Sequence, residues 1–221
     1  MVIQPGGGEV IGDSRERRVE ILSDDDALHA TLSRFGPGRE GADLHVHRRH
    51  TDLFYVLEGQ LTIRLGVEDE QVVAPAGTVA RVPPMVVHGF RNASDADVRY
   101  LNFHAPGVGF ADYMRGLRDG RKVPFDQEPP PDQGVRPASE AVLGPPPVEQ
   151  PIGIAELHGP PDGPQVDAAL LAFYVLAGEL TLTIDGREHP APAGAWAQVR
   201  PGAVHTLTGD ARYVRVRAPG V

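Results

Sequence analysis

The chain has 221 residues, no cysteine and a formal net charge of −9, from 21 basic and 30 acidic residues. Its length allows one large or two small domains, and an apolar content of 41% is ordinary for a globular core. The absence of cysteine excludes disulfides, zinc–thiolate sites, iron–sulfur clusters and cysteine nucleophiles, so any metal must be held by nitrogen and oxygen atoms. The acidic balance argues against nucleic acid as a partner.

The N-terminal residues show no basic segment followed by an apolar run, and no stretch approaches the ~18 apolar residues of a membrane span. We therefore expect a cytoplasmic protein that does not bind a membrane.

Short β-rich runs, broken by glycine or proline about every ten residues, predict an all-β sandwich or barrel. In the first half of the chain, strands are expected at 18–22, 28–35, 44–47, 53–58, 60–65, 71–73, 78–82, 87–91 and 98–104. One amphipathic helix is expected from Phe110 to Asp119, and Gly120 would end it.

An internal repeat divides the chain into two copies of one small domain. Phe54–Ile63 returns as Phe173–Leu182, and His88 returns as His205. The stretch between the copies carries two runs of three prolines, which cannot continue a helix or pair as a central strand. We therefore expect a first domain over residues 1–120, an extended connector over 121–150, whose packing is left open, and a second domain over 151–221.

Three histidines and one aspartate, His45, His47, Asp52 and His88, form the most informative group in the chain. Residues two apart on a β-strand point to the same face, so His45 and His47 can present two imidazoles to a cavity that Asp52 and His88 complete. Such a set suits one divalent Fe, Mn, Ni, Cu or Zn ion and leaves positions open for water or substrate. The sequence thus predicts a metal site. Direct ligation by Asp52 and contact through a water are both left open.

This first group resembles a motif of the cupin family of small β-barrels. The family places HxH before a glutamate and then a glycine. Here His45-Val46-His47 is followed after four residues by Asp52, and after six more by Gly59. Asp52 therefore stands where the family usually has glutamate.

A second family motif follows in the expected order. The family has a glycine, then PxG, a histidine and an asparagine. Here Gly77 is followed by Pro83-Pro84-Met85, His88 and Asn92. Met85 therefore stands where the family usually has glycine.

The resemblance implies two tandem cupin barrels of the jelly-roll (double-stranded β-helix) type, with one short helix and the proline-rich connector. The stretch Phe54–Gly59, and residues 101–107 before the expected helix, resemble quercetin-dioxygenase-like bicupins. This implies a metal-dependent oxidoreductase of a small organic substrate, with Asp52 as catalytic base. A non-catalytic ligand-binding or sensor protein, and a metal-assisted sugar isomerase or lyase, are the alternatives. Monomer and homodimer both remain open.

The remaining histidines and two aromatics complete the predicted site. Phe54 and Phe90 share the strand parity of the ligands and would line a dry substrate cavity. His50 is expected at the rim, or as a substitute ligand if a bulge shifts the register. Ordinary core or surface positions are expected for His29, His104, His158 and His189.

The second copy is expected to lack a metal. Alignment of the repeats puts Pro164 at the position of His45, Val166 at that of His47 and Leu171 at that of Asp52. Only His205 remains, and one imidazole does not hold a divalent ion. We therefore expect one metal per chain.

Overall fold

The computed structural model describes residues 1–149 and 152–219, and the chain divides into two compact units. The first unit is Val10–Pro145, and the second combines Met1–Glu9 with Pro146–Val221. Nearly all of the regular secondary structure in both units is β-strand, which agrees with the expected fold class. Residues 150 and 151, where the connector was expected to meet the second domain, lie outside the described residues.

The division differs from the expected domain boundaries at both ends of the first domain. Residues 121–145 pack with the first unit, because Val46 pairs with Glu128 and Val86 pairs with Arg136. The first residues of the chain belong to the other unit, because Val2 pairs with Ala197. Backbone pairing with residues far away in sequence decides which unit each of these two segments joins. Local amino-acid composition does not predict such pairing.

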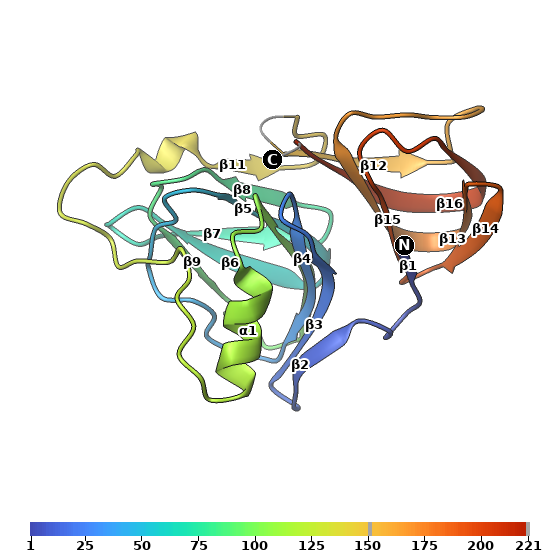
Figure 1. Cartoon of the computed structure of the whole chain (residues 1–221). Helices are drawn as coiled ribbons and strands as arrows, with labels where there is room; N and C mark the ends of the chain where they lie inside the picture. Colours follow the sequence, from blue (N-terminus) through green and yellow to red (C-terminus); the bar gives the residue numbers. More distant parts are fainter. Residues whose placement is uncertain (150–151, 220–221) are drawn as a thin grey trace. The chain divides into compact units, whose positions relative to one another are not determined.

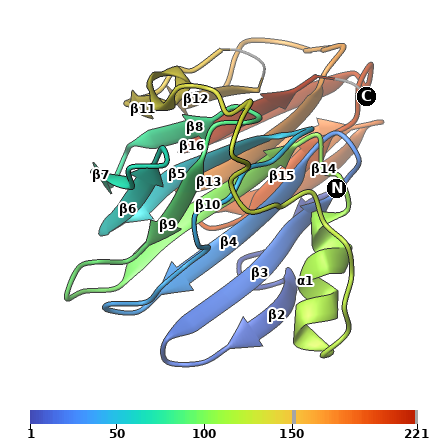
Figure 2. The ribbon, with the colours of Figure 1, turned by 90° about the vertical axis from the view of Figure 1, so that its left-hand side faces the viewer.

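The first unit consists of a seven-stranded and a three-stranded sheet. The larger has the order β11-β8-β5-β10-β4-β3-β2, and the smaller has the order β7-β6-β9. Figure 2 shows β2, β3, β4 and β10 side by side. The strands of this unit are β2 (Glu9–Asp13), β3 (Arg17–Asp24), β4 (His29–Phe35), β5 (Thr51–Glu58), β6 (Gln60–Leu65), β7 (Glu70–Pro75), β8 (Val79–Val82), β9 (His88–Arg91), β10 (Val98–Ala105) and β11 (Val142–Gly144).

The second unit has one six-stranded sheet in the order β1-β15-β13-β16-β12, with β14 paired to β13. Leu171, Phe173 and Val175 of its long central strand belong to the unit's apolar core. Its strands are β1 (Val2–Ile3), β12 (Gly153–His158), β13 (Leu170–Ile184), β14 (Arg187–Pro192), β15 (Trp196–Val199) and β16 (His205–Ala218).

Residues 44–47 were expected to form a strand, but the structure gives them only isolated bridges. His45 and His88 exchange two backbone hydrogen bonds of 2.9 Å, and Val46 bridges to Glu128. The pairing stops there because residues 48–50 leave the extended path to turn into β5.

The expected helix is present as α1 (Phe110–Arg118), followed by Gly120 at φ +66°. Figure 1 shows α1 beside β3, and its Ala111 and Met114 join the core of the first unit. A short 3-10 helix, η1 (Ala138–Glu140), precedes β11. In the part of the chain that the structure describes, no helix has the length and apolar character needed to span a membrane.

Met85 adopts a left-handed backbone conformation, at φ +66°, where the cupin motif usually has glycine. Both backbone groups are held, because its N–H donates to His47 O at 2.8 Å and its carbonyl accepts from Arg136 N at 2.8 Å. The corresponding residue of the second unit is Gly202, at φ +76°. A side chain at such a position costs about 1 kcal/mol.

We predict that Met85→Gly raises the free energy of unfolding by about 1 kcal/mol, because it removes this strain. The reverse change, Gly202→Met, should lower it by a similar amount, since a Cβ there would meet no atom within 4 Å and only backbone strain changes. Urea unfolding of both variants measures the two shifts. Shifts of the same sign in the two variants would contradict this explanation.

Candidate metal centre

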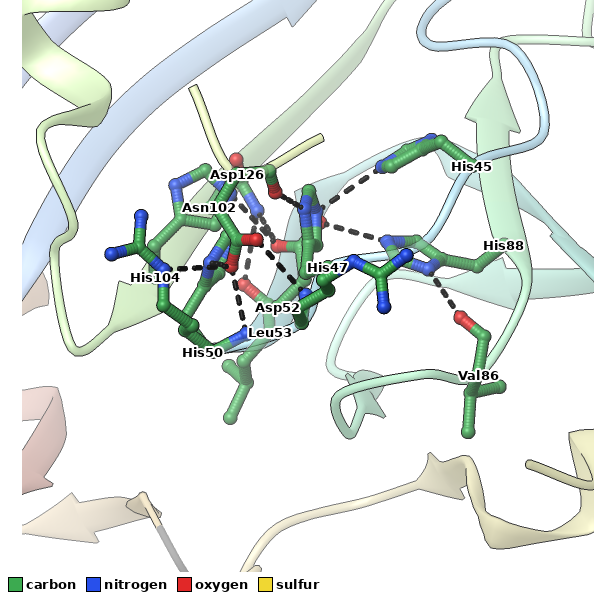
Figure 3. Close-up of polar contacts among 12 residues, drawn as sticks. His45, His47, His50, Asp52, Leu53, Val86, His88, Asn102, His104 and Asp126 are labelled. Atoms are coloured by element: carbon green, nitrogen blue, oxygen red, sulfur yellow. Dashed lines mark hydrogen bonds and ion pairs between the residues drawn. The ribbon is translucent and has the colours of Figure 1, made fainter. Parts of the chain in front are cut away.

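The four predicted side chains converge at one buried point of the first unit. One ligand atom from each of His45, His47, Asp52 and His88 lies within 4.8 Å of all the others, and none of the residues is more than 4% exposed. Figure 3 shows the three imidazoles grouped around the Asp52 carboxylate. The set that the sequence predicted is therefore brought together in space.

Each of the three rings is oriented by a hydrogen bond from Nδ1 to a backbone carbonyl. His45 Nδ1 lies 2.6 Å from Asp43 O, His88 Nδ1 lies 3.0 Å from Val86 O, and His47 Nδ1 bonds Asp126 O. A carbonyl oxygen only accepts, so each Nδ1 carries the hydrogen and donates it. The Nε2 atoms are then left with lone pairs.

These lone pairs face one another. His45 Nε2 and His47 Nε2 are 3.1 Å apart, and His88 Nε2 is 3.3 Å from Asp52 Oδ2. Two acceptors at such distances repel unless a cation lies between them. A transition metal ion satisfies all four atoms at once, and the nitrogen and oxygen donors fit such an ion.

Two neighbours hold the Asp52 carboxylate from the other side. Asn102 Nδ2 donates to Oδ1, and His104 Nε2 lies 3.3 Å from the same oxygen. Burial by itself would raise the pKa of Asp52, but the facing imidazole of His104, whose Nε2 can donate to Oδ1, opposes burial most strongly, and that pKa lies well below its usual range. The group is therefore an ionised oxygen donor.

Asp126 organises the turn that carries the first two histidines. Its carboxylate accepts from the backbone N–H groups of Arg48 at 3.0 Å and Arg49 at 2.8 Å, and from His50 Nδ1 at 2.9 Å. Its carbonyl accepts from His47. One residue from the expected connector thus fixes both the backbone of this turn and the orientation of a predicted ligand.

A second group of histidines adjoins the first, and the sequence indicated only His50 among its members, as a rim residue or a substitute ligand. His50, His104 and His29 are buried, and His47, His50 and His104 form another set that could hold a metal ion. Within the described residues, His50 Nε2, His104 Nδ1 and both nitrogens of His29 have no hydrogen-bond partner. Inward strand parity could have signalled His104, two positions after Asn102.

A cavity of about 330 Å³ opens beside the centre, and His45, His47 and Asp52 line it. Of the two predicted substrate-contacting aromatics, Phe90 lines the cavity. Phe54 lies in the core instead, with its ring 5.0 Å from that of Phe90. The lining is less dry than expected, because it also includes Thr31, Ser33, Tyr100, Asn102 and His104.

The second unit keeps the backbone frame of the centre but not its side chains. Gln165 pairs with His205 as His45 pairs with His88, and Asp167 O accepts from Gly202 N as His47 O accepts from Met85 N. The residues at the two histidine positions are therefore Gln165 and Asp167, one residue later than the expected Pro164 and Val166.

The remaining two positions of the second unit agree with the alignment. Leu171 pairs with Val199 as Asp52 pairs with Val82, which confirms leucine at the carboxylate position. Asp167 is held by Arg217 at 2.9 Å. Among the described residues, both groups that could hold a metal lie in the first unit.

Comparison with known families agrees with this geometry. The family model of the cupin domain matches residues 31–104 and 165–216, one segment in each unit and more than half of the chain. The chain belongs to the cupin family. Both segments of this cupin contain the returning histidine, His88 or His205.

Among curated proteins, the cupin is similar to quercetin 2,3-dioxygenase of Bacillus subtilis, with 29% identity over 120 residues. The match covers 53% of this chain and only 34% of that enzyme, so the chain spans about a third of the length of this relative. Together with the buried set of four donors, this similarity supports a metal-dependent cupin.

Solved structures share the fold over nearly the whole chain at low identity. The Ylba protein of E. coli has a TM-score of 0.70 at 16% identity, over 98% of this cupin and 89% of that chain. AerE of Microcystis aeruginosa has 0.66 at 12%, over 99% of both. Oxalate decarboxylase of Lactobacillus farciminis, a formate complex, has 0.66 at 11%, over 100% of this chain and 86% of that one.

We predict that His47→Ala and His88→Ala each abolish metal binding, because each removes one of four converging donors. Elemental analysis of the purified cupin should give about one transition metal per chain, and neither variant should retain it. His205→Ala is the matched control from the second unit and should retain the metal. Metal persisting in both variants, or two metals per chain, would contradict the assignment.

We also predict that the metal-free cupin loses stability as the pH falls below about 6.5, the ordinary pKa of histidine in an unfolded chain. Burial, then repulsion from His104 and Arg115, holds the pKa of His29 well below that value, and burial with His88 and His47 lowers the pKa of His45 to about 3. In this pH range, His29 and His45 therefore bind more protons in the unfolded chain than in the folded one, so acid favours unfolding.

The variant His29→Leu should reduce this loss by about 1 kcal/mol between pH 6.5 and 5.5, since it removes one such group. Urea unfolding in the presence of a chelator measures it. His158→Leu, at an exposed position, is the control and should keep the wild-type dependence. Equal pH dependence in wild type and His29→Leu would be evidence against buried neutral His29.

Proposed function

We propose that the first unit is a metal-dependent oxidoreductase centre of the dioxygenase type, acting on a small organic substrate. His45, His47, Asp52 and His88 would hold one divalent ion, of Fe, Mn, Ni, Cu or Zn. The observation that carries the proposal is the set of facing lone pairs beside a cavity large enough for such a substrate. The similarity to quercetin 2,3-dioxygenase supports the reaction type.

A bound ion of this kind would supply Lewis acidity, and a redox-active one would also supply electron transfer. The protein supplies position and exclusion of water. Phe90 on one wall, and Phe110, Tyr113 and Met114 of α1 on another, surround the cavity with apolar surface. The hydroxyls of Thr31 and Ser33 remain available to orient polar groups of a substrate.

Asp52 would act first as an ionised ligand. Its low pKa makes it a weak base, so it would accept a substrate proton only while the facing groups move away from it. His104 lines the cavity, and its Nε2 lies 3.3 Å from Asp52 Oδ1. It would be a second group for proton transfer beside this carboxylate.

The polar part of the lining favours a second candidate, a metal-assisted isomerase or lyase. Tyr100, Thr31 and Ser33 supply several hydroxyl groups, which such reactions use to bind and protonate oxygenated substrates. In either case the second unit would carry no metal, because both groups of described residues that could hold one lie in the first unit.

Oxygen uptake by the metal-loaded chain, with a panel of flavonols, catechols and diketones, tests the dioxygenase proposal. We predict uptake with at least one class, and a loss of at least about tenfold in metal affinity for Asp52→Asn, which removes the anionic donor. Asp52→Glu is the matched control, because it keeps the charge and restores the residue usual in the family.

Two other results of the oxygen-uptake experiment would contradict the dioxygenase proposal. Ligand binding without oxygen uptake would favour a binding or sensor protein, and substrate turnover without oxygen uptake would favour the isomerase or lyase.

A further inference from the structure

The strand registers show how the cavity of the first unit extends away from the metal centre. Asp52, His104 and His29 stand in one row across β5, β10 and β4, and Phe35 and Arg17 stand in another row across β4 and β3. The two rows are six residues apart on β4, which is about 20 Å at the usual rise of a strand. Both rows contribute to the same cavity lining, through Asp52 and His104 at one end and Arg17 and Phe35 at the other.

Arg17 at the far end lacks the partner that its neighbour has. Arg18 points to the other face of β3, where it pairs with Asp13 and lies 3.3 Å from Glu20. Arg17 lines the cavity, and among the described residues no carboxylate forms an ion pair with it. An arginine that is partly buried in a cavity and has no counter-ion is a ready anion site.

Arg39 adds to the positive charge at this end. It belongs to the turn that follows β4, where its N–H donates to Gly36 O, and it also lines the cavity. Its Nε is buried and has no hydrogen-bond partner within the described residues, while its Nη1 lies 3.5 Å from Glu16, a largely exposed group.

The acidic residues in the lining do not cancel these charges. Glu40 is held by Arg91 at 3.4 Å. Asp43 lies at the opposite end, where its carbonyl accepts from His45. The far end of the cavity is therefore positive, and the end at the metal centre carries the acidic groups.

Between the two ends the walls carry apolar side chains together with the hydroxyls of Thr31 and Ser33 from β4. The apolar side chains are Val19 from β3, Phe90 from β9, and Met114 and Leu117 from α1. Figure 2 shows α1 running beside β3, and Phe110, Tyr113, Met114 and Leu117 of this helix line the cavity. A ligand that fills it needs an apolar body with polar groups at both ends.

We propose that Arg17, assisted by Arg39, binds the carboxylate of an elongated organic acid whose other end carries the oxygen donor for the metal centre. The substrate class is then an amphiphilic acid with an apolar body. This inference rests on the proposed function only for the presence of a metal. The anion site itself depends on Arg17, and its test does not need turnover.

The test measures binding of two probes by calorimetry to the full chain loaded with Zn(II), which undergoes no redox change. The probes are 8-(hydroxyamino)-8-oxooctanoic acid and its methyl ester, which share the metal-binding hydroxamate and differ in the distal charge. The acid should bind roughly tenfold or more tightly than the ester, as expected for a charge-assisted hydrogen bond. Analogues of six, ten and twelve carbons locate the optimum length.

Arg17→Gln should bring the ratio of the two affinities to about one while leaving the ester unaffected, and Arg17→Lys should keep part of the preference. Arg15→Gln changes an exposed arginine outside the cavity lining and should keep the whole preference. Thermal unfolding of each variant checks that it is folded.

Equal affinity of acid and ester in the wild type, a preference that survives in Arg17→Gln, or no binding of either probe would overturn the proposal. The proposed function fails separately, if no substrate causes oxygen uptake while the acid retains its preference in the wild type and loses it in Arg17→Gln.

Discussion

The metal centre depends on one constraint, the donation of three Nδ1–H groups to backbone carbonyls. The acceptors are the carbonyl oxygens of Asp43, Val86 and Asp126. Asp43 and Val86 lie two residues before the histidines they bind, whereas Asp126 is far from His47 in sequence. Because the rings cannot turn without losing a hydrogen bond, their Nε2 lone pairs point at one another and at Asp52. The repulsion between these acceptors is part of the folded structure, and a cation at their common point removes it.

Comparison of the two units shows which features belong to the shared fold and which belong only to the metal centre. In both units a bridge joins the residue at the His45 position to the returning histidine, and that histidine donates Nδ1–H to the carbonyl two residues earlier, at 3.0 Å for His88 and 3.2 Å for His205. The second unit keeps this frame with Gln165 in place of His45 and Leu171 in place of Asp52. The frame is thus stable without convergent imidazoles, and the metal site is an addition to it.

The strand positions also determine which side chains line the cavity at each distance from the metal centre. Strand alternation sends His29, Thr31 and Ser33 of β4 to one side, and the row that each occupies sets its distance from the metal centre. Polar groups near the centre, hydroxyls in the middle and Arg17 at the end give a graded lining, with the apolar face of α1 as cover. Selectivity for a ligand would then follow from its length and from the charge at its far end.

The sequence alone determined the all-β class, the repeat, the helix and the four converging side chains, because alternation and motif spacing are local properties of a chain. It could not place Asp126, His104 or Arg17. Asp126 reaches His47 only because residues 121–145 fold back and pair with Val46, and His104 meets Asp52 only through the register between β10 and β5. The one-residue shift to Gln165 and Asp167 has the same cause, since backbone pairing, rather than residue type, defines equivalent positions. The ligands are encoded in short-range spacing, whereas the tertiary structure alone decides what surrounds them, because hydrogen bonds and strand registers there join residues far apart in the chain.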